Sequence, residues 1–74
     1  MDYKIGDKTP DGWEITSVYH KPIYTFRKRI KITNNHKNYN GMLGYYYLDS
    51  RFKWVELDDG SRIKLLESEF EYID

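Results

Sequence analysis

Side chains that could bind an anionic partner are concentrated in residues 23–33, IYTFRKRIKIT. The stretch carries Arg27, Lys28, Arg29 and Lys31. Successive strand side chains point to opposite faces, so Arg27, Arg29 and Lys31 share one face at intervals of about 6.6–6.8 Å. Guanidinium and ammonium groups in such a row suit phosphates or the carboxylates of an acidic protein surface. The stretch therefore predicts a strand that binds a partner through its basic face.

Lys28 falls on the opposite face of this strand, which alternation makes the core face. Its neighbours there are Tyr24, Phe26, Ile30 and Ile32. A lysine in this position is expected to run its apolar stem along the core and to bring its ammonium to the surface. Lys28 therefore joins the candidate partner-binding residues. A strand of this length is also expected to bend or bulge near Lys28.

Tyrosines close to the basic strand add a second kind of contact. Residues 45–47 are all tyrosine, and alternation buries one or two of the three. Tyr45 and Tyr47 share a face, and we take them as candidate partner-binding residues. Basic rows beside exposed rings are typical of proteins that bind single-stranded nucleic acids, in which the rings stack on bases.

The charge of the chain is balanced but unevenly distributed. Twelve basic and twelve acidic residues give a net charge of zero and a pI near 6.7. Residues 21–40 hold six basic residues and no acid, whereas 1–20, 41–60 and 61–74 each carry a net charge of −2. Such segregation predicts a polarised surface that steers a charged partner. The alternative is that acidic strands pair with the basic row inside the sheet, at about 0.2–1 kcal/mol per pair.

Catalytic and metal-binding chemistry has little support in the sequence. His20 and His36 have no cysteine partners and stand sixteen positions apart. The phosphate-binding glycine motifs, H-E-x-x-H and G-x-S-x-G do not occur, and Gly41 and Gly44 form only a G-x-x-G. We predict that the protein is not an enzyme, that it uses no metal or cofactor, and that both histidines are loop or strand-end residues.

Composition predicts one all-β domain over residues 1–74. The chain has no cysteine, alanine or glutamine, but it has eight tyrosines and seven isoleucines. Aromatic and β-branched residues favour strands, whereas alanine favours helices. The absence of cysteine, of a signal-peptide pattern and of any run of eighteen apolar residues predicts a cytoplasmic protein with no membrane contact. The richness in Lys, Ile, Asn and Tyr resembles coding by an AT-rich genome, such as that of a low-GC bacterium or its phage.

Turn residues divide the chain into short strands. Turns are expected at Pro10-Asp11-Gly12, Asn40-Gly41 and Asp59-Gly60, where proline fixes φ or glycine accepts a positive φ. One helical turn is allowed for at Leu66–Glu69. In the second strand we expect Trp13, Ile15 and Tyr19 on one face and Val18 on the other. The expected strands are 2–5, 13–20, 23–33, 45–50, 51–57, 62–66 and 68–74, with 45–57 alternatively one strand folded at Asp49-Ser50.

These features predict a small antiparallel barrel of five to six strands, of the SH3-like or OB-like kind. We expect it to act by protein–protein contact, as an inhibitor from a phage or mobile element that occludes a host or defence protein. The alternative function is nucleic-acid binding through the basic strand and its tyrosines, although a pI near 6.7 is low for that role. The sequence leaves open whether the protein is a monomer or a homodimer.

Overall fold

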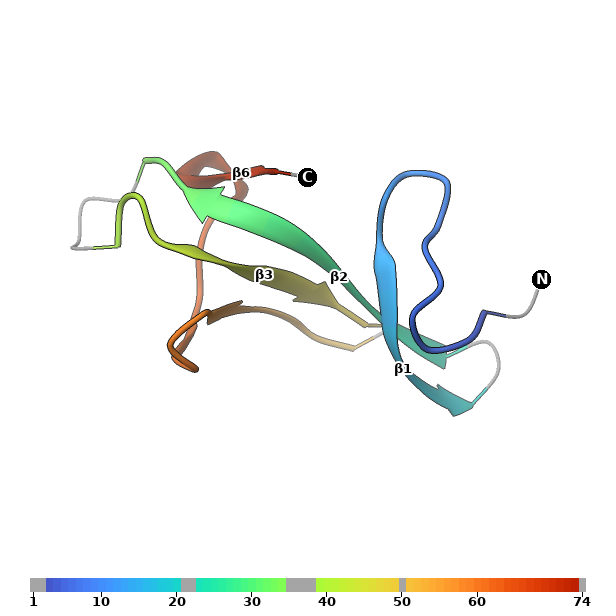
Figure 1. Cartoon of the computed structure of the whole chain (residues 1–74). Helices are drawn as coiled ribbons and strands as arrows, with labels where there is room; N and C mark the ends of the chain where they lie inside the picture. The colour runs from blue at the N-terminus through green and yellow to red at the C-terminus, as the bar shows by residue number, and fades with distance from the viewer. Residues whose placement is uncertain (1–2, 21–22, 35–38, 50, 74) are drawn as a thin grey trace.

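The computed structural model describes residues 3–20, 23–34, 39–49 and 51–73. These residues form one antiparallel sheet with a single 3-10 turn, so the all-β class is confirmed (Figure 1). Strand propensity accounts for this outcome, because the strands consist largely of Tyr, Ile, Val, Thr and Phe. The elements are β1 (Glu14–His20), β2 (Ile23–Ile32), β3 (Leu43–Leu48), β4 (Lys53–Leu57), β5 (Arg62–Ile63), η1 (Glu67–Glu69) and β6 (Phe70–Tyr72).

β2 is the longest described strand, and it pairs with three others. One of its edges pairs with β3 in an unbroken register from Phe26 to Lys31. The other edge pairs with β1 up to Arg27 and with β6 from Ile30 onward. No shift interrupts the β2–β3 register near residues 28–29, where the sequence predicted a bend or bulge. Instead, β2 changes partner there, between the ends of β1 and β6.

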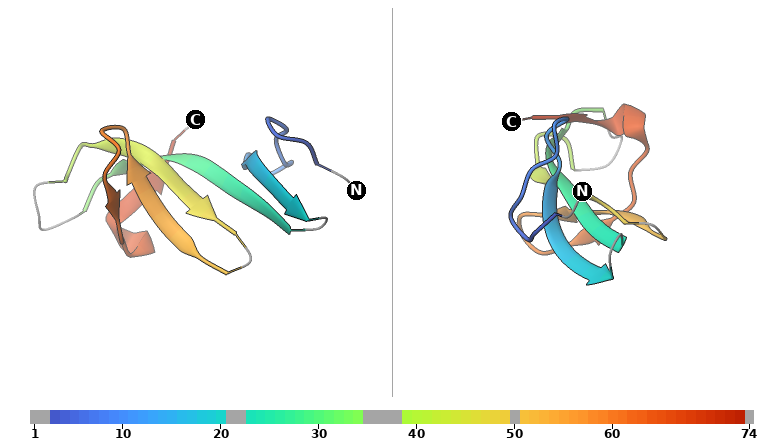
Figure 2. Two further views of the ribbon diagram at one scale, coloured as in Figure 1. Left: turned by 90° about the horizontal axis from the view of Figure 1, so that it is seen from below. Right: turned by 90° about the vertical axis from the view of Figure 1, so that its right-hand side faces the viewer.

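The sheet is curled but open. Its strands follow the order β1-β2-β3-β4-β5, with β6 beside β2, and among the described residues β5 pairs with neither β1 nor β6. The molecule is elongated, at 40 × 22 × 21 Å. Figure 2 shows β1 and the N-terminal segment at one end, and β6 with η1 toward the other. The predicted closure of the sheet into a barrel is therefore not seen in this part of the chain.

The inner face of the sheet carries the core. Strand register places Ile30 beside Gly44, and the pairs Tyr46–Val55 and Gly44–Leu57 continue the same face onto β4. Ile30 and Ile32 are fully buried, and Phe70 of β6, which pairs with Ile32, belongs to the same core cluster. The predicted core face of residues 24, 26, 28, 30 and 32 is thus confirmed. We call the opposite face, which carries Arg27 and Arg29, the outer face.

The segment before β1 is a turn and a loop, whereas the sequence predicted a strand at 2–5. The backbone N–H of Asp7 donates to the carbonyl of Lys4, and the Asp7 carboxylate accepts from the N–H of Lys4. Gly6, at φ +94°, lets the chain reverse there. Residue 2 lies outside the described residues. The prediction is wrong for residues 3–5 because this local side-chain bond competes with strand pairing.

β1 contains two irregularities that reverse the predicted faces of its second half. Its register shifts between Ile15 and Ser17, and again between Val18 and His20. Each shift inserts one extra residue opposite β2, and a slip of one residue moves a side chain to the other face. Val18 therefore lies opposite Tyr24 of the inner face, and Tyr19 is 71% exposed. The prediction that Tyr19 shares a face with Ile15 was wrong.

The three predicted turns are present. Gly12 donates its N–H to the Thr9 carbonyl, and Gly41, at φ +88°, follows Asn40 in the turn that leads into β3. The hairpin between β4 and β5 has a three-residue loop ending at Gly60, which is the usual place for glycine in such loops. The helical turn considered at residues 66–69 is also present, as the 3-10 turn η1.

Candidate functional site

The outer face brings together five of the six predicted partner-binding residues. Strand pairing places Arg27 opposite Tyr47 and Arg29 opposite Tyr45, and residues directly opposite each other share a face. Lys31 lies farther along β2 and is exposed. Alternation within β3 buries Tyr46, at 7% exposure, and leaves its two neighbours half-buried on the outer face.

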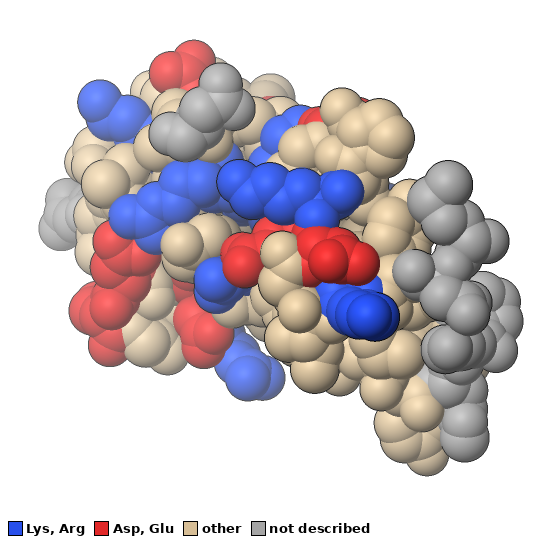
Figure 3. Space-filling model, turned by 45° about the vertical axis from the view of Figure 1, so that its right-hand side comes forward, with Lys and Arg blue, Asp and Glu red and all other residues tan. Residues whose placement is uncertain are grey.

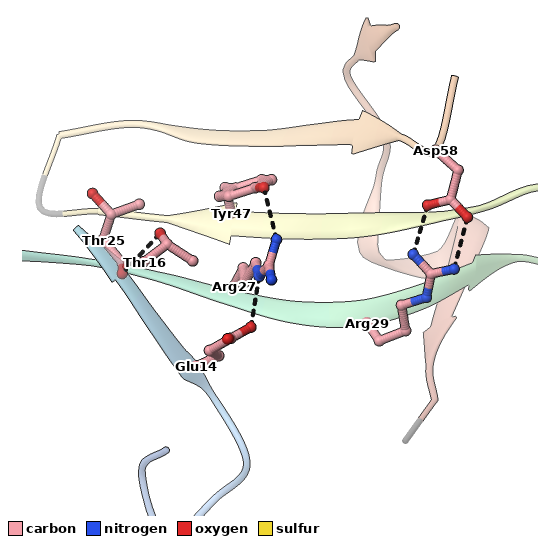
Figure 4. A network of polar contacts seen from close by, with 7 residues as sticks. All are labelled: Glu14, Thr16, Thr25, Arg27, Arg29, Tyr47 and Asp58. Carbon is pink, nitrogen blue, oxygen red and sulfur yellow. Dashed lines mark hydrogen bonds and ion pairs between the residues drawn. The ribbon is translucent and has the colours of Figure 1, made fainter. Parts of the chain in front are cut away.

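Arg27 is held by residues from both neighbouring strands. Its Nε donates to the Glu14 carboxylate of β1 at 2.7 Å, and Nη1 makes a longer contact of 3.4 Å to the Tyr47 hydroxyl (Figure 4). The guanidinium carbon also lies 4.0 Å from the centroid of the Tyr45 ring, within cation–π range. The hydrogen bond that Arg27 donates to Glu14 raises the pKa of the Arg27 guanidinium above its usual value. Arg27 is therefore a permanent, fixed cation.

Arg29 holds the carboxylate of Asp58, which follows β4. Nη1 and Nη2 donate to its two oxygens at 2.6 and 2.7 Å, a fork geometry that only arginine offers (Figure 4). The backbone N–H of Asp58 donates to the carbonyl of Leu43, which brings Asp58 across the end of β3. The hydrogen bond from Arg29 lowers the pKa of the Asp58 carboxyl, so the pair stays ionised at neutral pH.

The aromatic rings of the outer face form a continuous array. Tyr45 lies under both guanidiniums, with Arg29 at 4.8 Å from its centroid. Tyr47 stacks on Trp54 of β4 with centroids 5.1 Å apart and planes 1° from parallel. Arg62 of β5 lies over the far side of the array, 6.0 Å from the Trp54 centroid. Trp54 and Arg62 were not in the predicted set, although alternation in 53–57 gives Trp54 and Glu56 a common face.

Lys28 is separated from the outer face. Its Nζ donates to the backbone carbonyl of Asp11 at 2.7 Å. On the way it lies over the rings of Trp13 and Tyr72, at 5.5 and 4.9 Å from their centroids. The predicted course of the side chain, from the core face to the surface, is confirmed. The predicted six residues therefore divide into five on the outer face and one on the inner face.

Charges of opposite sign alternate on the folded surface. Glu14 and Asp58 neutralise the two central arginines, and Glu56 lies 3.9 Å from Arg62. Figure 3 shows the consequence, because a band of basic atoms is bordered directly by acidic atoms. Within the run of residues 21–40 that has no acid, Arg27 and Arg29 are thus matched in space by acids from β1 and from the loop after β4.

The described residues contain no cluster of three or more metal-ligating side chains. His36 and the side chain of His20 lie outside the described part of the structure, and the backbone of His20 ends β1, as predicted. Among the described segments, no helix combines the length and apolar composition needed to cross a membrane. No protein-family model, curated protein or solved structure matches the chain.

Proposed function

We propose that the protein is a non-catalytic binding protein that covers a surface of a protein partner with its outer sheet face. The observation that carries the proposal is the array of Tyr45, Tyr47 and Trp54 with Arg27 and Arg29. Solvated sheet faces usually carry small polar and charged residues, whereas Tyr, Trp and Arg dominate binding energy at protein interfaces. Stacking and ion pairs already fix these side chains, so little conformational entropy is lost when a partner binds.

Glu14 and Asp58 compensate the charges of Arg27 and Arg29, and this favours a protein partner over a nucleic acid. A nucleic-acid strand that runs along the whole basic row would bring successive phosphates close to the carboxylates of both Glu14 and Asp58, which are hydrogen-bonded to Arg27 and Arg29. A mixed protein surface meets no such repulsion, and the neutral net charge is no handicap to it. Nucleic-acid binding stays the alternative, with Lys31 as the exposed cation of the row.

Occlusion is the form of binding that we propose, as for an inhibitor from a phage or mobile element. A small, preorganised sheet that covers a functional surface of its partner needs no catalytic group. The scaffold type that we propose for this sheet is an SH3-like or OB-like barrel opened along β5. The support for this proposal is that one edge of β2 pairs with both β1 and β6 in a curled sheet.

The test is partner capture from a bacterial lysate with the tagged protein and two matched variants. Tyr47→Ser/Trp54→Ser removes the stacked pair from the outer face, and we expect it to lose the captured protein while keeping its circular dichroism spectrum. Phe52→Ser removes an aromatic ring that is 61% exposed beyond this array, and it should retain the partner. Equal capture by all three proteins would refute the outer face as the interface.

Nucleic acid is tested in the same series. Fluorescent single- and double-stranded DNA and RNA are titrated at low and physiological salt, beside an Arg27→Glu/Arg29→Glu/Lys31→Glu variant. We expect no binding by the unmodified protein. Binding with a log–log salt slope of about −2 on a single strand, lost in the folded variant, would establish the alternative, because three phosphate contacts give that slope.

A further inference from the structure

A hollow of about 390 Å³ opens where β2 changes partner from β1 to β6. We call it the β1–β6 notch. Four cations line it, Lys8, Arg27, Lys28 and Arg29, together with one carboxylate, that of Glu14. Side chains from both faces of β2 reach this place. Along this edge the pairing with β1 ends at Arg27, and on the other side of the hollow the N–H of Ile73, directly after β6, donates to the carbonyl of Arg29.

Two lysines approach the notch from separate elements. Lys8 forms an isolated antiparallel bridge with Glu14, which places it on the far side of that residue from Arg27. Lys28 is anchored by the carbonyl of Asp11 in the turn before β1. Neither ammonium lies within 4.0 Å of a described carboxylate, and each ammonium has three donors, of which Lys28 gives one to that carbonyl.

Gly12 of the same turn makes room for the Lys28 side chain. Its φ is +94°, and a Cβ there would lie 3.4 Å from Cε of Lys28. Any other residue would therefore strain the backbone, and its Cβ would be in van der Waals contact with the lysine. The turn thus positions the ammonium at the edge of the notch.

Both arginines have N–H donors that make no hydrogen bond to a described residue. A guanidinium has five N–H groups, and the contacts of Arg27 and Arg29 with described residues use two on each. The nearby carboxylates are already engaged, Glu14 by Arg27 and Asp58 by Arg29. The carboxylate of Asp11 accepts from the Thr9 hydroxyl, and this bond, more than the charge of Lys28, lowers the pKa of the Asp11 carboxyl. Unused donors therefore outnumber unused acceptors.

We infer that the β1–β6 notch binds an oxyanion, a carboxylate or phosphate group presented by a side chain of the protein partner. The inference rests on the proposed function for the source of the group. Ammonium and guanidinium donors that converge from four residues suit such a group through charge-assisted hydrogen bonds. The volume is large enough for an acidic side chain together with part of its backbone.

The test uses small anions and needs no partner. Inorganic phosphate, acetyl-glutamate amide and acetyl-phosphoserine amide are titrated into the isotope-labelled full chain at constant ionic strength. We expect saturable NMR shifts of the Nε–H groups of Arg27 and Arg29 and of the Lys8 and Lys28 side chains. The two amides distinguish a carboxylate from a phosphate source. Asp74 follows Ile73, a residue that lines the notch, so the titrations are repeated in Asp74→Asn to exclude competition from that carboxylate.

Matched variants separate a built site from general attraction to positive charge. Lys8→Gln/Lys28→Gln should weaken phosphate binding about ten-fold or more, as expected for the loss of charge-assisted contacts. Lys53→Gln/Lys64→Gln removes two lysines that line a different hollow, of about 420 Å³, and should leave binding unchanged. If the double variant does not fold, Lys8→Gln alone replaces it, because this side chain is exposed. We expect the single variant to weaken phosphate binding less than ten-fold but measurably.

Equal weakening by both double variants, or shifts that follow ionic strength alone, would overturn the oxyanion site. That failure is distinguishable from failure of the proposed function, because partner capture through Tyr47 and Trp54 is measured separately. Loss of capture with intact phosphate binding would refute the outer-face interface and leave the notch in place.

Discussion

Arginine occupies the positions of β2 at which the sheet makes polar contacts across three strands. The fork of Arg29 engages both oxygens of Asp58, and Arg27 contacts a carboxylate, a hydroxyl and a ring at once. A lysine has a single nitrogen and could not satisfy either geometry. Lys31, at the exposed end of the row, lies within 4.0 Å of no described carboxylate. The residue types therefore follow the number of partners that each position has.

The Arg29–Asp58 pair predicts a pH-dependent contribution to stability. The pKa of Asp58 is lower in the folded protein than its usual value of 3.8, so the folded state binds this proton less tightly than the unfolded chain. The pair therefore stabilises the fold above about pH 4, and the contribution is lost as the pH falls through the lower folded-state pKa. Asp58→Asn should be less stable than the unmodified protein in urea at pH 7, and the difference should shrink toward pH 3.

Glu71→Gln is the control for net charge in this comparison. Glu71 is an exposed acid opposite Lys31 on β6, and no hydrogen bond fixes its carboxylate to a described residue. At pH 7, Glu71→Gln should lower the free energy of unfolding by less than Asp58→Asn does. If Asp58→Asn keeps the same deficit at pH 3 as at pH 7, the deficit comes from packing and the ion pair contributes nothing.

At the scale of elements, the sequence predicts most of the strands but not all of their bounds or their partners: no strand forms at residues 3–5, and the strand expected at 62–66 is limited to Arg62–Ile63. The alternation in 23–33 and the glycines at 41 and 60 locate β2 and two turns within a residue or so, because strand faces and positive φ are local properties. The bulges of β1 are different, since nothing in EITSVYH marks where an extra residue enters. Tyr19 was assigned to the wrong face for that reason.

The candidate site shows the same division. Arg27, Arg29, Tyr45 and Tyr47 are on one face, as alternation predicts, because the property is local to each strand. Their ion pairs depend on register between strands and on the loop after β4, which carries Asp58 to Arg29 across β3. Neither is encoded by the local pattern, so pairing inside the sheet could be named only as an alternative to an exposed basic face.

Gly44 limits how closely β3 and β4 can approach. The residue is buried opposite Leu57, and a Cβ at this position would lie 2.6 Å from the carbonyl oxygen of Glu56. Gly44→Ala is therefore expected to destabilise the protein by about 1–3 kcal/mol in urea unfolding, as overpacking of a core usually does. Leu43→Ala, at an adjacent outer-face position, is the comparison and should cost less. A neutral Gly44→Ala would mean that β4 shifts freely at this point.

At the scale of the whole molecule, the described residues form two apolar groups along its length. One is the core around Ile30, Val55 and Phe70, and the other gathers Tyr3, Tyr24 and Phe26 near the N-terminal segment. Trp13 joins the first group by edge-on contacts with Tyr46 and Tyr72, at 6.1 and 5.8 Å between centroids. The N-terminal segment is thereby attached to the central core as well as to β1.

Because Trp13 links the N-terminal segment to the core, we predict that this segment and the rest of the sheet unfold together, and the two tryptophans can report on this. Trp54→Phe leaves Trp13 as the reporter of the N-terminal segment, and Trp13→Phe leaves Trp54 as the reporter of the outer face. In each variant we expect the urea transition followed by fluorescence to coincide with that followed by circular dichroism, as two-state unfolding requires. A Trp13 transition at lower urea than the loss of strand signal would show that the N-terminal segment detaches first.

The sharing of β2 between β1 and β6 has a consequence for synthesis on the ribosome. The first hairpin can form early, but the pairing of Ile30–Ile32 with residues 70–72 joins parts of the chain about forty residues apart. Until those residues emerge, Ile30 and Ile32 lack the part of their core cluster that Phe70 supplies, and the second half of a long strand edge has no partner. Until residues 70–72 have been synthesised, this part of the β2 edge is therefore open to pairing with strands of other chains, which favours aggregation.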